Sequence, residues 1–97
     1  MQINVALQDG FDADTVLIRV DGAEVYRGEQ LTTRTQISHA ADMQLDVPDR
    51  PFTLEVDVPT RRVHEAIEVD PHAHPNVALS LLDGGIVAAY PERLGFA

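Results

Sequence analysis

Three aspartates gather in one turn-forming segment of the chain, and carboxylates in loops are typical ligands of calcium. Asp9, Asp12 and Asp14 lie in this segment, and Asp83 lies in a later turn. Calcium takes about six to eight oxygen ligands, several of them loop carboxylates. The aspartate run is therefore a candidate Ca²⁺ site. Aspartate and glycine are also the residues that ordinary solvated turns use, so the two interpretations stand side by side.

A second candidate metal site is the sequence Asp-Pro-His-Ala-His-Pro, which contains His72 and His74. In an extended backbone, residues two positions apart point the same way, so both imidazoles could reach one ion such as Zn²⁺. Asp70 would supply a third ligand. The alternative is a rigid, exposed turn bounded by its two prolines.

A catalytic site has weaker support. Ser38 or Ser80 could be combined with a histidine and an aspartate, but no G-x-S-x-G motif surrounds either serine. A chain of 97 residues seldom closes a deep pocket. We therefore expect a protein that is not an enzyme, and a small enzyme is kept only as an alternative.

The segments that would position these residues alternate apolar and polar side chains with a period of two, which predicts strands. In Phe52–Val58, leucine and valine alternate with acidic residues between Pro51 and Pro59. A similar run, Val63–Val69, follows a short polar turn. The two runs predict a hairpin at the centre of an antiparallel sheet, with one face exposed to water.

The same alternation recurs along the chain, and the turns between the runs are rich in Asp, Gly and Pro. Further predicted strands are Gln2–Leu7, Thr15–Val20, Ala23–Arg27, Ala41–Val47, Val77–Leu81 and Ile86–Tyr90. Gly28–Ala40 predicts a long loop, with an edge strand near Thr33–Ile37. We expect an all-β fold: a single domain spanning residues 1–97, built as an antiparallel two-sheet sandwich (Ig-like or prealbumin-like) of seven to eight strands.

Strand direction predicts which loops lie together. If each connection reverses the chain, alternate loops share one end of the sandwich. Four connections would meet at one end: Asp9–Asp14, Gly28–Ala40, Pro59–Arg62 and Asp83–Gly85. The remaining three would meet at the other end: Asp21–Gly22, Pro48–Pro51 and Asp70–Pro75.

Charge and composition exclude several classes of partner. The chain has sixteen acidic residues, seven arginines and no lysine, which gives a formal net charge of −9. Such a surface repels phosphate backbones and anionic lipids, so neither nucleic acid nor membrane is an expected partner. The chain has no cysteine, which excludes disulfides. No signal peptide or long apolar span is apparent, so a cytoplasmic location is the default expectation.

Leu17, Tyr26 and Ala66 are apolar residues at strand positions whose side chains are expected to point away from the core. Together they predict a surface patch suited to a dimer. The favoured function is a non-enzymatic interaction module that binds a protein partner, or itself, through strand edges, loops or self-association. The expected cofactor is none. The alternative is a β-domain that binds Ca²⁺ or a transition metal such as Zn²⁺.

One pair of segments resembles a known family. Val20-Asp21-Gly22-Ala23-Glu24-Val25, followed later by Phe52-Thr53-Leu54-Glu55-Val56, resembles small prealbumin-like sandwich domains, including PEGA-type modules. Asp49-Arg50-Pro51 stands where such modules often carry a Gly-His pair. The resemblance implies a binding or structural module without catalytic residues.

Overall fold

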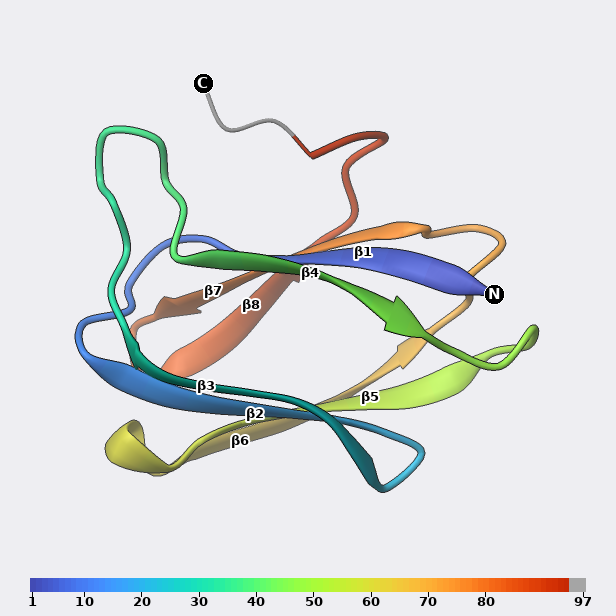
Figure 1. Ribbon diagram of the computed structural model, residues 1–97, viewed down its shortest axis with the longest axis horizontal. Coiled ribbons are helices and arrows are strands. Elements are labelled where there is room, and N and C mark those ends of the chain that lie inside the picture. Colours follow the sequence, from blue (N-terminus) through green and yellow to red (C-terminus); the bar gives the residue numbers. More distant parts are fainter. Residues whose placement is uncertain (95–97) are drawn as a thin grey trace.

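The protein folds as two stacked four-stranded sheets, seen edge-on in Figure 1. The computed structural model describes residues 1–94. The elements are β1 (Gln2–Leu7), β2 (Asp14–Val20), β3 (Ala23–Leu31), β4 (Ala41–Asp46), β5 (Phe52–Val58), the short 3₁₀ helix η1 (Pro59–Arg61), β6 (Val63–Val69), β7 (Asn76–Leu82) and β8 (Gly85–Ala89). The predicted all-β, two-sheet sandwich is confirmed. No helix within residues 1–94 has the length and apolarity needed to cross a membrane.

One sheet has the strand order β4-β1-β7-β8 and the other has the order β3-β2-β5-β6. Neighbouring strands are antiparallel except β1 and β7, which pair in parallel from Asn4 opposite Asn76 to Leu7 opposite Leu79. A purely antiparallel sandwich was therefore the wrong expectation at this one position. The reason is directional: strands with odd numbers run the same way, so two of them can be neighbours only in parallel.

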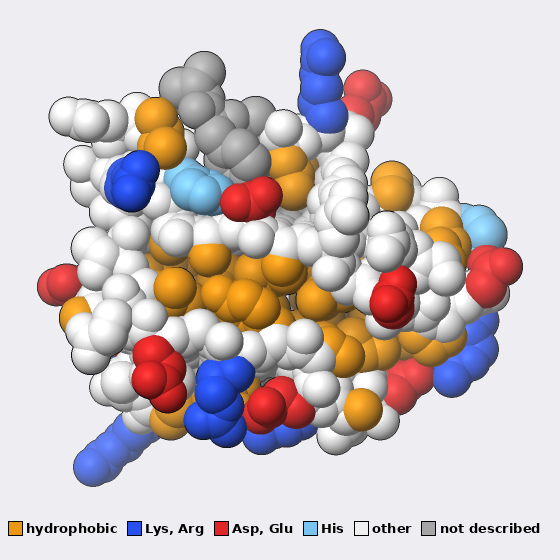
Figure 2. All heavy atoms as spheres, in the orientation of Figure 1, with side chains coloured by type: hydrophobic (Ala, Val, Ile, Leu, Met, Phe, Trp, Pro, Cys, Tyr) orange, Lys and Arg blue, Asp and Glu red, His pale blue; other side chains and the backbone are white. Residues whose placement is uncertain are grey.

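The core lies between the sheets and comes from the predicted alternation. In β5, Leu54, Val56 and Val58 are buried, whereas the residues between them are only partly so. Burial of one such side chain stabilises the fold by about 1.5–3 kcal/mol. Figure 2 shows an apolar strip exposed between the two layers. Partly buried apolar side chains of β3 and β4 that pack on the core are Tyr26, Leu31, Ala41 and Met43.

The predicted hairpin between β5 and β6 is confirmed, with continuous antiparallel pairing from Phe52 opposite Val69 to Val58 opposite Val63. Its place in the sheet differs from the expectation of a central hairpin. β5 lies inside the sheet, but β6 is the outermost strand. The acidic and histidine side chains of β6 suit this edge position.

The long loop predicted for Gly28–Ala40 is shorter than expected. β3 continues to Leu31, and its pairing with β2 shifts register twice along the way. The edge strand predicted near Thr33–Ile37 is wrong, because this segment forms a turn closed by an isolated bridge between Arg34 and His39. The end of β3 was predicted as loop because an outer strand can carry polar residues on both faces, which removes the alternation of apolar and polar side chains.

The loops assemble at two ends, as the alternation of strand direction predicts. At one end, Thr33 N–H donates to Phe11 O at 2.9 Å, and Leu81 N–H donates to Asp9 O at 2.8 Å. At the other end, the Arg50 guanidinium contacts the Asp21 carboxylate at 3.1 Å. The first end holds the predicted aspartate run.

Candidate functional site

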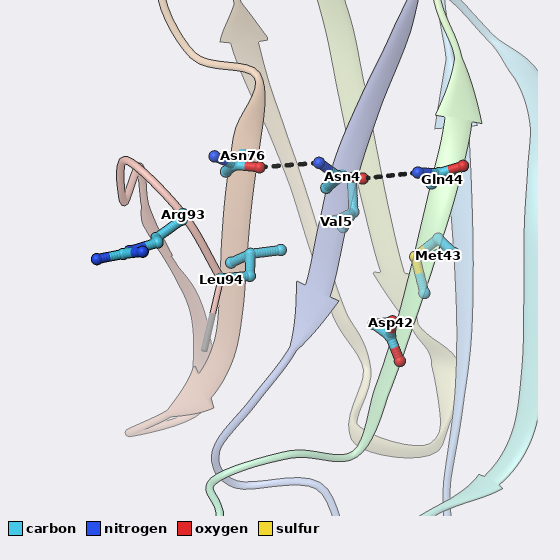
Figure 3. Close-up of a pocket in the computed structure, with 8 residues that line it drawn as sticks. All are labelled: Asn4, Val5, Asp42, Met43, Gln44, Asn76, Arg93 and Leu94. Carbon is cyan, nitrogen blue, oxygen red and sulfur yellow. Dashed lines mark hydrogen bonds between the residues drawn. The ribbon is translucent and has the colours of Figure 1, made fainter. Parts of the chain in front are cut away.

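A polar groove lies on the outer face of the β4-β1-β7-β8 sheet, and a row of amides crosses it (Figure 3). Gln44 Nε2 donates to Asn4 Oδ1 at 3.2 Å, and Asn4 Nδ2 donates to Asn76 Oδ1 at 3.0 Å. Asn76 Nδ2 then donates to the main-chain oxygen of Glu92 at 2.6 Å. The amides therefore bond mainly to one another. The row attaches the chain after β8 to the sheet, which is a structural role.

The sole carboxylate among the groove-lining residues is Asp42, and neither Ser38 nor Ser80 lines the groove. Ser80 Oγ instead accepts a hydrogen bond from Asp9 N–H at 3.2 Å. Ser38 lies in a turn with a φ of 48°. The serines thus stand apart from the groove, and the Ser80 hydroxyl supports the loop after β1.

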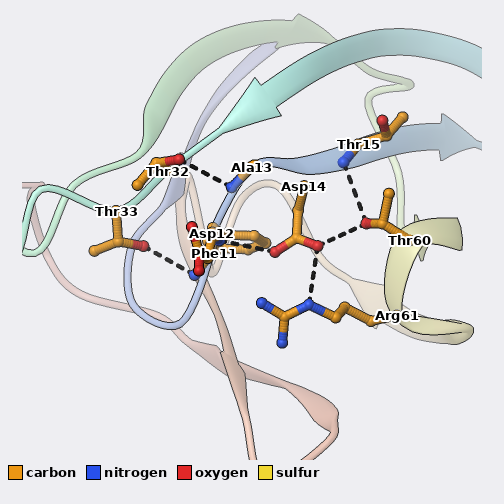
Figure 4. Close-up of polar contacts among 9 residues, drawn as sticks. All are labelled: Phe11, Asp12, Ala13, Asp14, Thr15, Thr32, Thr33, Thr60 and Arg61. Atoms are coloured by element: carbon orange, nitrogen blue, oxygen red, sulfur yellow. Dashed lines mark hydrogen bonds and ion pairs between the residues drawn. The ribbon is translucent and has the colours of Figure 1, made fainter.

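Asp14 is the centre of a polar cluster that joins the start of β2 to η1 (Figure 4). Its side chain is 1% exposed, and it accepts hydrogen bonds from Thr60 Oγ1 at 2.6 Å and Arg61 Nε at 3.0 Å. Asp12 N–H donates to its second oxygen at 2.8 Å. Burial alone would raise the pKa of Asp14, but the Thr60 and Asp12 donors and the Arg61 charge together lower it.

The structure does not assemble the predicted calcium ligands into one site. Asp14 uses its oxygens within the cluster described above, and Asp12 contributes its main-chain N–H to it. Asp9 joins β1 to β7 through its carbonyl. Within residues 1–94, no group of three or more His, Asp or Glu side chains, Asp83 included, is placed to hold a metal ion.

The two predicted zinc ligands also take separate partners. The His72 ring contacts the Asp49 carboxylate through Nε2, and His72 N–H donates to Asp70 Oδ1 at 3.0 Å. The His74 ring lies against Tyr90, with ring centroids 4.4 Å apart. The two imidazoles therefore do not converge on a common point.

Metal ions should leave the thermal stability of the protein unchanged. A ligand that binds only the folded state raises the midpoint of unfolding, and neither candidate ligand set is assembled. We expect the same midpoint with 1 mM Ca²⁺, 1 mM Zn²⁺ or EDTA, to within about 1 °C. Differential scanning fluorimetry measures it, and a reproducible rise with one ion alone would restore the metal-binding alternative.

The predicted dimer patch is not formed. Tyr26 lies opposite Ile18 and packs on the core, and burial raises the pKa of its phenol. Leu17 is only 7% exposed, although it stands outside the main core cluster. Ala66 is exposed on β6, opposite Glu55. These three side chains do not share an exposed surface, because a register shift in β3 turns Tyr26 inward.

The four edge strands differ in how they are protected against pairing with another chain. Charged side chains and bulges on an edge strand disfavour such pairing. Three edges carry charged or titratable side chains: Glu24, Arg27 and Glu29 on β3, Asp42 and Asp46 on β4, and His64, Glu65 and Glu68 on β6. The fourth, β8, has the sequence Gly-Ile-Val-Ala-Ala, with no charged residue and no proline. It is the edge strand without charge, although β6 of the other sheet lies close to it, with Glu65 Oε1 3.9 Å from the position that a Cβ of Gly85 would take.

Apolar side chains are also exposed around β8. Val87 is 51% exposed, and Leu82 and Tyr90, which flank the strand, are 45% and 40% exposed. The sequence signal for this surface was available: the stretch from Gly85 to Tyr90 has no charge in a chain where acids are frequent. The meaning of that signal depends on β8 lying at an edge, which the pattern alone does not reveal.

The outward main-chain groups of β8 follow from its turn. Asp83 and Gly84 have φ values of 52° and 76°, which is typical of a two-residue type I′ turn. Such a turn joins Leu82 and Gly85 as a hydrogen-bonded pair, and hydrogen-bonded pairs alternate along an antiparallel ladder. The N–H and C=O groups of Ile86 and Ala88 therefore point away from β7. Among the described residues, β8 pairs with no other strand.

Resemblance to known proteins gives no independent guide to this surface. No protein-family model, no curated protein and no solved structure matches the chain.

Proposed function

We propose that this protein is a non-catalytic interaction module that binds an extended segment of a protein partner by pairing it with β8. One observation carries the proposal: β8 is the edge strand without charge, and it is flanked by exposed apolar side chains. Strand addition to a sheet edge is a common mode of peptide recognition, in which main-chain hydrogen bonds supply affinity.

The geometry of β8 indicates what the added segment must look like. It would bond to the outward N–H and C=O groups of Ile86 and Ala88. Its side chains would alternate between the exposed Val87 face and the side on which Ile86 and Ala88 pack against the core. The expected partner segment therefore has apolar residues at alternate positions.

The family resemblance is compatible with this function. Its two segments are neighbours in one sheet, where Val20 of β2 pairs with Leu54 of β5. We propose on this ground that the chain is a prealbumin-like sandwich, a class for which the sequence implied a binding or structural role. The net charge of −9 further favours a protein segment over a polyanion.

A displayed library of random extended peptides tests the proposed function. Selection on the wild-type protein should enrich peptides with alternating apolar residues, and Ala88→Pro should weaken their binding by at least about tenfold. Proline at this position removes an outward N–H, while the ladder to β7 keeps its bonds. Val25→Lys, at an exposed valine on the β3 edge, is the control that should bind normally. Failure to enrich any peptide sensitive to Ala88→Pro would refute the proposal.

A further inference from the structure

Three Asp-Gly pairs occur in the chain, and two of them form the same kind of two-residue turn. Asp21-Gly22 connects β2 to β3 with φ values of 49° and 87°, and Asp83-Gly84 connects β7 to β8 with φ values of 52° and 76°. We infer that Asp83 is a site of spontaneous covalent modification, in which the main-chain nitrogen of Gly84 attacks the aspartate side chain and converts the residue to isoaspartate. The modification would occur whether or not β8 binds a partner.

The reaction is intramolecular, because both reacting groups belong to the turn. The Gly84 nitrogen bonds to Cγ of the protonated Asp83 side chain, the bond from Cγ to the hydroxyl breaks, and this hydroxyl leaves as water with the hydrogen of the Gly84 N–H. Solvent water then opens the resulting cyclic imide. Opening at the former main-chain carbonyl leaves Gly84 attached through Cγ, so the main chain becomes longer by one carbon atom. Glycine after the aspartate favours ring closure, since it has no Cβ to hinder the attack.

The turn between β7 and β8 leaves both reacting groups accessible. Asp83 and Gly84 are exposed, and no hydrogen bond or ion pair within residues 1–94 involves the Asp83 side chain. In a type I′ turn the hydrogen bond across the turn uses the N–H of the fourth residue, here Gly85, so the N–H of Gly84 is not engaged by the turn. A Cβ at Gly84 would meet no atom within 4 Å, which shows open space around the attacking nitrogen.

The Asp21 turn has the same shape and the same open space at its glycine, but its carboxylate is held in place. Thr53 N–H donates to Asp21 Oδ1 at 3.0 Å, Arg50 donates to Oδ2 at 3.1 Å, and Asp21 N–H donates to Thr53 O at 3.0 Å. Donors to a carboxylate favour its ionised form, whereas ring closure needs the neutral acid. Hydrogen bonds to a charged group are strong enough to slow a reaction that breaks them by at least about tenfold.

The third pair, Asp9-Gly10, is held by packing against β7. A Cβ at Gly10 would lie 1.7 Å from the main-chain oxygen of Leu81, and Leu81 N–H donates to Asp9 O at 2.8 Å. Ring closure rotates the peptide unit between Asp9 and Gly10, so it would first have to detach this loop from Leu81. Asp83 is therefore the reactive member of the three pairs.

Isoaspartate at this position would alter β8, because the length of a hairpin turn sets the register of its two strands. An extra carbon atom in a two-residue turn prevents Leu82 and Gly85 from pairing as they do in the unmodified chain. The amides of Val87 and Ala89, which face β7, should then exchange their hydrogens at least about tenfold faster in the modified protein. Amides of the β5-β6 hairpin are the internal control and should exchange as before.

Peptide mapping after several weeks at about pH 5 tests the modification, since mild acid supplies the neutral form of aspartate. Cleavage after arginine places the three Asp-Gly pairs in separate peptides, residues 1–19, 20–27 and 63–93. Isoaspartate has the mass of aspartate, so electron-transfer fragmentation and labelling by an isoaspartyl methyltransferase identify it. In the folded protein Asp83 should convert at least about tenfold faster than Asp21 or Asp9. In urea, where the contacts of Asp21 are lost, Asp21 and Asp83 should convert at similar rates.

Two variants test the chemistry and its control by the fold. Asp83→Glu keeps the charge of the turn but requires a larger ring, so it should abolish the modification in residues 63–93. Arg50→Ala removes one contact of the Asp21 carboxylate and should raise the rate at Asp21 about twofold to fivefold while leaving that at Asp83 unchanged. Absence of isoaspartate at Asp83, equal rates at Asp21 and Asp83 in the folded protein, or a difference that persists in urea would each overturn the inference.

Discussion

Gly10→Ala should destabilise the protein by more than about 3 kcal/mol, and the variant is expected to be largely unfolded at 37 °C. Gly10 has a φ of 89°, a conformation that favours glycine. A Cβ at this position would lie 1.7 Å from the main-chain oxygen of Leu81. Neither backbone can move easily, since Leu81 N–H is bonded to Asp9 O beside it. The loop after β1 would have to leave β7.

Gly22→Ala is the matched control for this substitution. Gly22 has nearly the same φ, 87°, but a Cβ there would meet no atom within 4 Å. Its replacement should cost only the backbone penalty of about 1–2 kcal/mol. Urea unfolding followed by circular dichroism measures both variants. If the two substitutions lower the free energy of unfolding equally, the close approach of Gly10 to Leu81 does not contribute to stability.

Asp14→Ala should lower the free energy of unfolding by about 2–4 kcal/mol, the second largest effect that we expect. The substitution leaves the Thr60 hydroxyl and the Asp12 N–H without their acceptor in a site where Asp14 is 1% exposed. Arg61 is 42% exposed, so water can solvate its freed charge. Thermal unfolding measures the loss, and Asp12→Ala, which removes an exposed side chain, is the control expected to change stability by less than about 0.5 kcal/mol.

Asp14 should also contribute to acid sensitivity. Its pKa is lowered in the folded protein because the Thr60 and Asp12 donors and the Arg61 charge outweigh the opposing effect of burial. The unfolded chain therefore binds a proton more readily, from about pH 4 downwards. The stability that Asp14 supplies is present above that pH and is lost as the pH falls through its folded-state pKa.

Asp14→Asn should accordingly flatten the fall in stability between about pH 5 and pH 2. Some slope should remain, because the Thr53 N–H, and after it the Arg50 guanidinium, lower the pKa of Asp21 at the other end of the sandwich. Urea midpoints across this pH range measure the slope. An unchanged slope in Asp14→Asn would mean that Asp14 titrates alike in both states.

Much of the fold follows from the sequence because a sandwich exposes one face of each strand. In β5, the alternation of Leu54, Val56 and Val58 with acidic residues identifies both the strand and its buried face. The direction of each strand then follows from counting turns, which brings the correct loops together at each end. It also requires the parallel pairing of β1 with β7, once these two strands are neighbours.

The candidate site was harder to predict, because it depends on which strands lie at the edges. Nothing in the residues of Gly85–Ala89 shows that one side of β8 is unpaired; the pairing of all the other strands decides it. The register shift in β3 after Ile18 also escapes a strict count of two, and it moves Tyr26 to the core side. The sequence also indicated that Asp14 is a metal ligand, because it is an acidic residue in a loop. Its burial in the structure shows instead that it accepts hydrogen bonds that support the fold.

The pairing of β1 with β7 determines the order in which the two sheets can be completed during translation. All four strands of the β3-β2-β5-β6 sheet lie between residues 14 and 69, a segment that also contains β4 of the other sheet, so the β3-β2-β5-β6 sheet can form as soon as that segment leaves the ribosome. The other sheet is completed later: β1 can pair with β4, but its second neighbour, β7, is made from residues 76–82. Until then a ribosome-bound chain holds β1 with one side unpaired, and premature termination before residue 76 would yield a half-built sandwich.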